Sequence, residues 1–178
     1  GMLNRRAICD QLQKELAHAE RHGDRLVVGM CDIDHFKQVN DRYGHQTGDE
    51  VLCGLAQILS ENLRKYDSVG RVGGEEFLLI MPMKAKTDPL PLVDRLCMRI
   101  SESRIATRSG EISITVSIGV SCQKAGTTVD EILMAADTAL YQAKNNGRNR
   151  VVLSNTFSNT APPVRILNAD DREKQGQP

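Results

Sequence analysis

The chain has 178 residues, of which 40% are hydrophobic, and this is enough for one domain with a buried core. Its 23 lysines and arginines balance its 23 aspartates and glutamates, which argues against a general binder of nucleic-acid polymers or of acidic membranes. It has no run of about 18 apolar residues and no visible signal peptide, so we expect no membrane span and a cytoplasmic location.

Cysteines are spread along the chain without any CxxC pair. Their odd number and wide spacing disfavour both a zinc site and a disulfide scaffold. We therefore expect all of them to be reduced core residues of a cytosolic protein. They are Cys9, Cys31, Cys53, Cys97 and Cys122.

The first third of the chain predicts a helix, a buried strand and a second helix. Residues 4–22 carry apolar side chains at helical spacing, and 26–33 form a nearly continuous apolar run that is typical of a central strand. A polar stretch follows over 35–50. Residues 51–63 then predict an amphipathic helix.

A hairpin is expected next. Residues 68–72 and 77–81 are predicted to be two short strands, and the pair Gly73-Gly74 between them favours a tight turn. Residues 82–91 contain three prolines and are predicted to be a loop.

The remaining elements alternate between helix and strand. Residues 92–105 and 129–143 predict helices, and 150–153 a last short strand. Between them, 112–120 alternate apolar and polar side chains, which is typical of a strand with one buried and one polar face.

This order predicts an α+β fold in which helices cover a mostly antiparallel sheet. We expect the folded domain to span 1–153. Residues 154–178 are polar, contain two adjacent prolines and are predicted to be a flexible tail. Gly1 ahead of Met2 is expected to be an addition to a natural chain whose N-terminal edge has been truncated.

Two acidic clusters are candidates for a metal site. Asp32 and Asp34 lie at the end of the predicted central strand, and Glu75 and Glu76 follow the glycine pair. Neighbouring carboxylates beside an apolar core repel one another, and a hard cation such as Mg²⁺ relieves that conflict. If the hairpin lies beside the strand, the clusters meet. Either cluster alone is often only a solvated strand end or turn.

The polar stretch between the clusters offers groups for a purine. A carboxylate such as Asp49 can accept both N–H groups of the guanine edge, whereas adenine presents an acceptor there. Asn40 suits the same edge. His45 is equally a loop hydrogen-bonder, and Lys37 is either a surface lysine or a phosphate contact.

A basic pair, Lys144 and Arg148, flanks the turn at 145–147. Cations are favoured at a helix C-terminus in any protein. The alternative is a contact with the terminal phosphates of a nucleotide.

Four segments, in the same order, closely resemble the GGDEF family of diguanylate cyclases over roughly residues 3–153. Glu75 stands where the family name has aspartate, and active members of the family use either residue. The segments are DIDHFKQVNDRYGHQTGDE (32–50), RVGGEEFLLI (71–80), TVSIGV (115–120) and ADTALYQAKNNGRNR (136–150).

The resemblance implies a palm-like fold, related to nucleotide cyclases and polymerases, that condenses two GTP into cyclic di-GMP and two pyrophosphates. The domain would be the cytoplasmic part of a longer sensor protein. It also implies residue roles. Two Mg²⁺ or Mn²⁺ ions per half-site would be held by Asp32, the carbonyl of Ile33, Glu75 and Glu76.

Catalytic roles are implied for three residues: Glu75 as the base for the attacking 3′-hydroxyl, Glu76 as its assistant, and Lys37 as the stabiliser of transition-state charge. The GTP contacts implied by the resemblance are Phe36, Asn40, His45, Asp49, Gly73, Gly74, Lys144 and Arg148.

The product is two-fold symmetric and each domain has one GTP half-site, so catalysis is expected to require an antiparallel homodimer. The resemblance further implies an inhibitory site for cyclic di-GMP at the RxxD pattern Arg64–Asp67. Arg95 of a neighbouring chain would complete that site.

Two alternatives remain open. The first is a catalytically silent GGDEF domain that binds GTP or cyclic di-GMP as a regulatory module, against which the intact motif 73–77 argues. The second is an adenylyl-type cyclase or other nucleotidyltransferase on the same palm, against which Asn40 and Asp49 argue.

Overall fold

The structure is a computed structural model that describes residues 2–155. The expected tail, 154–178, therefore lies almost entirely outside the described residues, and the domain boundary at 153 stays a prediction. No helix in the described part of the chain is long and apolar enough to cross a membrane.

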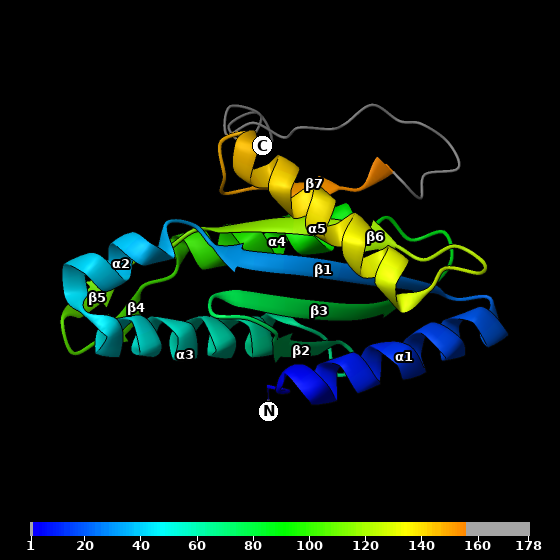
Figure 1. Ribbon diagram of the computed structural model, residues 1–178, viewed down its shortest axis with the longest axis horizontal. Helices are drawn as coiled ribbons and strands as arrows, with labels where there is room; N and C mark the ends of the chain where they lie inside the picture. Colours follow the sequence, from blue (N-terminus) through cyan, green and yellow to red (C-terminus); the bar gives the residue numbers. More distant parts are fainter. Residues whose placement is uncertain (1, 156–178) are drawn as a thin grey trace, which may run out of the picture.

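A five-stranded sheet forms the centre of the molecule (Figure 1). Its middle strand, β1 (Arg25–Ile33), is antiparallel to β3 (Glu76–Met83) on one side and to β6 (Val116–Cys122) on the other. The edges are β2 (Ser68–Arg71), antiparallel to β3, and β7 (Val151–Leu153), parallel to β6. The predicted hairpin and the mostly antiparallel sheet are confirmed.

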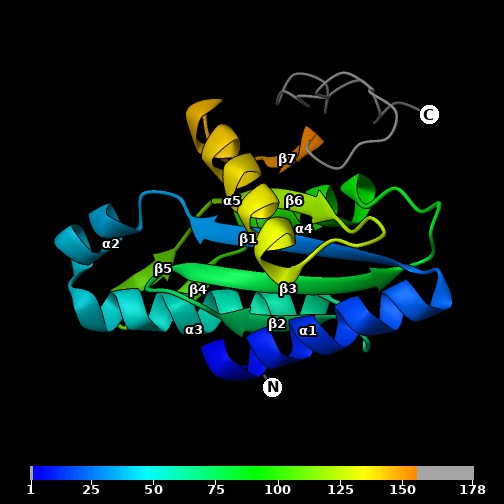
Figure 2. The same cartoon turned by 45° about the vertical axis from the view of Figure 1, so that its right-hand side comes forward.

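Helices cover both faces of this sheet. The long α1 (Arg5–His22) and α5 (Val129–Asn145) share one face, where their apolar side chains form one core cluster with β1 and β3. Figure 2 shows α5 crossing that face diagonally. On the other face, α3 (His45–Asn62) and α4 (Leu90–Glu102) enclose a larger core cluster. The α+β class is confirmed.

The segment predicted as a polar stretch, 35–50, is instead helical. It forms α2 (Phe36–Tyr43) and the first turns of α3, which begins at His45 rather than at residue 51. Gly44, with φ of 85°, separates the two helices and lets the chain turn between them. The polar side chains are tolerated because most of this segment is exposed.

A small hairpin was missed as well. The strands β4 (Ile105–Thr107) and β5 (Gly110–Ile112) pair only with each other and pack against α3. They occupy the end of the predicted helix 92–105 and the start of the predicted strand 112–120. Three residues each is too short for a periodic signal.

The polar face expected for 112–120 is exposed at Ser113 and half-buried at Thr115, but it is buried within β6. Ser117 and Ser121 of β6 are fully buried because α5 lies over them. Gly119 permits this contact: a Cβ there would lie 2.1 Å from the Ala136 carbonyl oxygen. Small residues on this face admit a helix, so the alternation marked a second buried face.

The cysteine prediction holds only in part. The five cysteines form no disulfide within residues 2–155, and Cys31, Cys97 and Cys122 are buried. Cys9 is half-buried, and Cys53 is exposed on α3. The expectation that every cysteine lies in the core was therefore wrong for Cys53.

Candidate active site

The two acidic clusters meet, as the sequence predicted. Strand register pairs Asp32 of β1 directly with Glu76 of β3. The backbone N–H of Ile33 donates to the Glu75 carbonyl at 3.4 Å, so the hairpin turn lies against the end of the central strand. Both clusters therefore occupy one end of the sheet.

Arg71 holds the glycine turn by hydrogen bonds to its backbone. Its guanidinium donates to the Gly73 carbonyl at 3.2 Å and to the Gly74 carbonyl at 2.6 and 3.1 Å. A Cβ on Gly73 would lie 2.2 Å from a Glu76 carboxylate oxygen. Glycine at 73 thus leaves room for the Glu76 carboxylate in this position, whereas Gly74 faces open space.

Desolvation and a neighbouring negative charge act on both Asp32 and Glu75. Asp32 is 5% exposed, and burial raises the pKa of its carboxyl, while an ion pair with Lys144 at 2.8 Å opposes the rise. The pKa of Glu75 is also raised, first by desolvation and then by the charge of Asp32. Both groups would gain from a nearby cation.

These acids suit a hard divalent ion, although they supply few side-chain ligands. Within residues 2–155 there is no group of three or more His, Cys, Asp or Glu side chains arranged to hold a metal. The donors available are Asp32, Glu75 and the Ile33 carbonyl. Such a set suits Mg²⁺, which takes one or two carboxylates and keeps its other positions for water and phosphate oxygens.

The basic pair joins this end of the sheet. Lys144, on the last turn of α5, forms the ion pair with Asp32. Arg148 follows in the turn after the helix, and its positive charge lowers the pKa of Asp32. The structure therefore places both cations next to the acidic end of β1.

The predicted purine contacts lie where α2 meets α3. A Cβ on Gly48 would lie 1.9 Å from the Asn40 side-chain oxygen and 3.3 Å from the Phe36 ring, so both side chains reach the first turn of α3. Asp49 is the next residue along and is exposed. Asn40 therefore packs against the turn of α3 that carries Asp49.

Lys37 and His45, which were also predicted to contact the nucleotide, are exposed on α2 and at the first position of α3. Both lie on the elements that carry Asn40 and Asp49. Their roles stay predictions.

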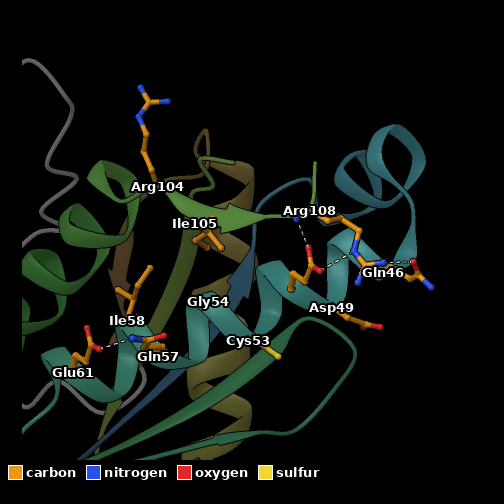
Figure 3. Close-up of a pocket in the computed structure, with 12 residues that line it drawn as sticks. Gln46, Asp49, Cys53, Gly54, Gln57, Ile58, Glu61, Arg104, Ile105 and Arg108 are labelled. Carbon is orange, nitrogen blue, oxygen red and sulfur yellow. Dashed lines mark hydrogen bonds and ion pairs between the residues drawn. The ribbon is translucent and has the colours of Figure 1, made fainter. Parts of the chain in front are cut away.

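Asp49 also lines an open groove between α3 and β4 (Figure 3). Arg108 binds two other residues of α3 and acts as a clamp on this helix. The Arg108 backbone N–H and Nε each donate to a Glu50 carboxylate oxygen at 2.8 Å. The Arg108 guanidinium also donates to the Gln46 side-chain oxygen. Sequence reasoning missed this clamp because 58 residues separate its partners.

The RxxD segment forms a compact turn beside a small pocket. Asp67 Oδ2 accepts the Arg64 backbone N–H at 2.8 Å, and both residues line the pocket with Leu3 and Ser60. The other oxygen, Oδ1, is buried without a hydrogen-bond partner. Arg95 is exposed on α4 and does not line this pocket.

Asp34, grouped with the acidic cluster in the sequence, has separate partners. Its carboxylate accepts hydrogen bonds from Thr115 and Ser117 at 2.7 Å and from the Asn149 backbone at 2.9 Å. The alternation of hydroxyl residues in 115–117 was the only signal for this network.

An antiparallel sheet that presents carboxylates, a glycine turn and a basic pair at one end has the groups needed for metal-dependent phosphoryl transfer. The sequence matches the family model described as "Diguanylate cyclase, GGDEF domain" over residues 1–150, and the chain belongs to this family. Dependence on a divalent metal is general among diguanylate cyclases of this family.

Similar proteins carry related descriptions. The chain is 37% identical over 153 residues to "Diguanylate cyclase DosC" of Escherichia coli (strain K12), covering 85% of this chain and 33% of that protein. It thus spans about a third of the length of the curated relatives it matches.

Solved structures agree with the fold. The GGDEF domain of DgcB from Caulobacter crescentus, in complex with c-di-GMP, matches with a TM-score of 0.79 and 35% identity, over 85% of this chain and 91% of that chain. The active GGEEF domain of a diguanylate cyclase from Vibrio cholerae matches with a TM-score of 0.79 and 34% identity, over 86% and 98%. Like this chain, it is described with glutamate at the third motif position.

Proposed function

We propose that this domain is a diguanylate cyclase that condenses two GTP into cyclic di-GMP and two pyrophosphates. The observation that carries the proposal is the register of β1 and β3, which brings the intact Gly73–Phe77 motif against Asp32. Family membership and the basic pair at the same end support it. We place the domain, residues 1–153, in the cytoplasm, where GTP is available.

Asp32, the Ile33 carbonyl and Glu75 would hold two Mg²⁺ or Mn²⁺ ions per half-site, with Glu76 assisting. When bound, such ions supply positive charge to the attacking 3′-oxygen and to the pyrophosphate leaving group. The raised pKa of both carboxyls, caused first by desolvation, supports this assignment.

The protein's own groups then divide the remaining work. Glu75 takes the proton of the 3′-hydroxyl, and Lys37 stabilises the charge that develops on phosphate oxygens. Lys144, whose ion pair holds Asp32 in the absence of substrate, exchanges that carboxylate for the β- and γ-phosphates. Arg148 contacts the same phosphates.

The guanine of GTP is bound at the junction of α2 and α3. Asn40 and Asp49 hydrogen-bond the guanine edge, and the contact of Asn40 with the turn of α3 that carries Asp49 supports this pairing. The remaining contacts proposed for GTP line the path from base to phosphates: Phe36, His45, Gly73 and Gly74.

Catalysis requires two chains, because one domain holds one GTP. In an antiparallel homodimer, each 3′-oxygen bonds to the α-phosphorus of the other GTP, and each α–β bridging bond breaks to release pyrophosphate. Two such transfers close the ring of cyclic di-GMP.

We also propose that the product binds Arg64 and Asp67 of one domain and Arg95 of another, and inhibits turnover. The small pocket that Arg64 and Asp67 line together supports this site.

The test is product identification by mass after a dimerised domain is incubated with Mg²⁺ and GTP, with ATP in parallel. Cyclic di-GMP from GTP alone is the expected result. Binding of GTP without any product would favour the silent regulatory module, and a cyclic product from ATP would favour the adenylyl-type enzyme.

A further inference from the structure

Asp34 is a buried carboxylate that joins three distant segments of the chain. It is 6% exposed and makes no ion pair with any residue in 2–155. Thr115 and Ser117 donate their hydroxyls to Oδ2 and Oδ1, each at 2.7 Å. The Asn149 backbone N–H donates to Oδ2 at 2.9 Å. Three donors compensate the charge in place of a cation.

The turn that Asp34 holds has an unusual backbone. Gly147, Arg148 and Asn149 have φ angles of 107°, 60° and 45°, so two consecutive non-glycine residues lie in the left-handed region. That conformation is unfavourable for both and persists only where surrounding contacts enforce it. The Arg148 backbone N–H donates to Ala143 at 3.0 Å, which fixes the start of the turn. The bond from Asn149 to Asp34 fixes its end.

The residue between these two fixed points is Arg148, a proposed phosphate contact. Its neighbour Lys144 already lies 2.8 Å from Asp32, so the turn stands over the acidic end of β1. A left-handed residue projects its side chain in a direction that a relaxed turn would not reproduce. The direction of the Arg148 side chain therefore depends on the turn staying left-handed.

We propose that Asp34 is a positioning residue: by accepting the Asn149 N–H it holds the 147–149 turn left-handed and so aims Arg148 at the terminal phosphates of GTP. This inference rests on the proposed function, since it takes the phosphates as the partner of Arg148. In this proposal Asp34 acts through the Asn149 N–H rather than by contact with substrate or metal.

The experiment compares two nucleotides that cannot be turned over. One is 3′-deoxy-GTP with Mg²⁺, which lacks the attacking hydroxyl, and the other is GMP, which lacks the terminal phosphates. Calorimetric titration gives the affinity of each for the parent and for Asp34→Ala. We expect Asp34→Ala to lower the affinity for 3′-deoxy-GTP about tenfold or more and to leave the affinity for GMP unchanged.

Matched variants separate positioning from simple loss of a buried network. Asp34→Asn keeps an oxygen for the Asn149 N–H and turns its amide toward Ser117, whose hydroxyl can accept, so it should restore triphosphate affinity. Thr115→Val and Ser117→Ala each remove one bond to Asp34 but leave the Asn149 bond in place. Both variants should have a lower Tm than the parent but an unchanged affinity for 3′-deoxy-GTP.

If Asp34→Ala does not fold, Asp34→Ser, with a hydroxyl too short to reach Asn149, takes its place. An equal loss of GMP and 3′-deoxy-GTP affinity would overturn the proposal, as would an unchanged triphosphate affinity or an equal loss in Thr115→Val. Failure of the proposed function is distinguishable: the parent would bind 3′-deoxy-GTP yet yield no cyclic di-GMP from GTP.

Discussion

At the scale of single residues, Asp32 balances a buried charge against one cation. Burial raises the pKa of its carboxyl, and Lys144 is the main group that opposes the rise. A metal ion at Asp32 would take over this compensation and leave Lys144 free for phosphate. The ion pair with Lys144 thus stabilises the charged form of Asp32 until a metal ion replaces it.

Glu75→Gln should abolish turnover while keeping the fold. The change removes a proposed metal ligand and base, so the rate should fall on the order of 10³-fold or more. Product formation measured at matched dimer content tests the rate. Mg²⁺ should raise the Tm of the parent but not of the variant.

Glu102→Gln, an exposed substitution at the end of α4, is the matched control and should behave like the parent. Turnover of Glu75→Gln within about tenfold of the parent would remove Glu75 from the catalytic role.

Asp67 gives the domain a pH dependence of predictable sign. Burial raises the pKa of Asp67 above 3.8, and the N–H and charge of Arg64 oppose the rise. The folded domain therefore binds this proton more tightly than the unfolded chain. Stability from Asp67 is present at low pH and is lost as pH rises from 3.8 through the raised pKa.

Asp67→Asn removes this loss and keeps an acceptor for the Arg64 N–H. Its free energy of unfolding, relative to the parent, should increase across that window and then level off. Urea unfolding at several values between about pH 4 and pH 7 measures the difference. Asp10→Asn, exposed on α1, is the control. A difference that declines with pH would contradict the assignment.

At the scale of elements, the contact of α5 with β6 depends on one missing side chain. A Cβ on Gly119 would lie 2.1 Å from both the Ala136 carbonyl oxygen and the Leu140 nitrogen, which are backbone atoms and cannot rotate away. This contact positions the helix that carries Lys144, so packing in the core and geometry at the site are linked.

Gly119→Ala should therefore lower the free energy of unfolding by about 1–3 kcal/mol or more. Gly29→Ala, in the adjacent strand, is a matched control, because its Cβ would meet the flexible Leu79 side chain at 3.3 Å. Chemical denaturation measures the free energy of unfolding of both variants, and the loss should be larger for Gly119→Ala. Equal losses would show that the close approach of α5 is not what requires glycine.

The elements that sequence predicted best are those with a long periodic pattern, such as α1 and β1. The segment 35–50 failed because α2 has only eight residues, and its three core contacts, Phe36, Val39 and Tyr43, are too few to stand out as a periodic signal among polar residues. The face of β6 failed for another reason: alternating Ser and Gly is typical of an exposed face, yet small residues also admit a close helix.

The candidate site was predictable where residues are adjacent in the chain and unpredictable where tertiary contacts assemble it. Asp32 and the glycine turn were found from local motifs, and the register brings them together. Asp34 and Asn149, 115 residues apart, are joined only in the fold. The same holds for the clamp of Arg108 on α3.

At the scale of the whole molecule, the active end and the RxxD turn lie apart on the sheet. Ser68 pairs with Ile80 and Arg71 with Phe77, so Asp67 lies about four strand residues, roughly 13 Å, from the level of the catalytic turn. Product bound at Arg64 need not touch GTP. We therefore expect inhibition through the arrangement of two domains, in which a product-linked pair cannot bring its GTP sites together.

Arg64→Ala should weaken the binding of cyclic di-GMP ten- to a hundredfold, because charge-assisted hydrogen bonds worth about 1.5–3 kcal/mol are lost. Catalysis should survive, since the acidic end of the sheet is untouched, and progress curves should stay linear for longer. Calorimetric titration of the product, together with initial rates and full progress curves, measures both effects. Lys14→Ala removes an exposed cation of α1 that does not line this pocket, and it should leave product affinity and the curvature of the progress curves unchanged. Equal product affinities in Arg64→Ala and the parent would mean that the RxxD pattern here is an ordinary surface turn.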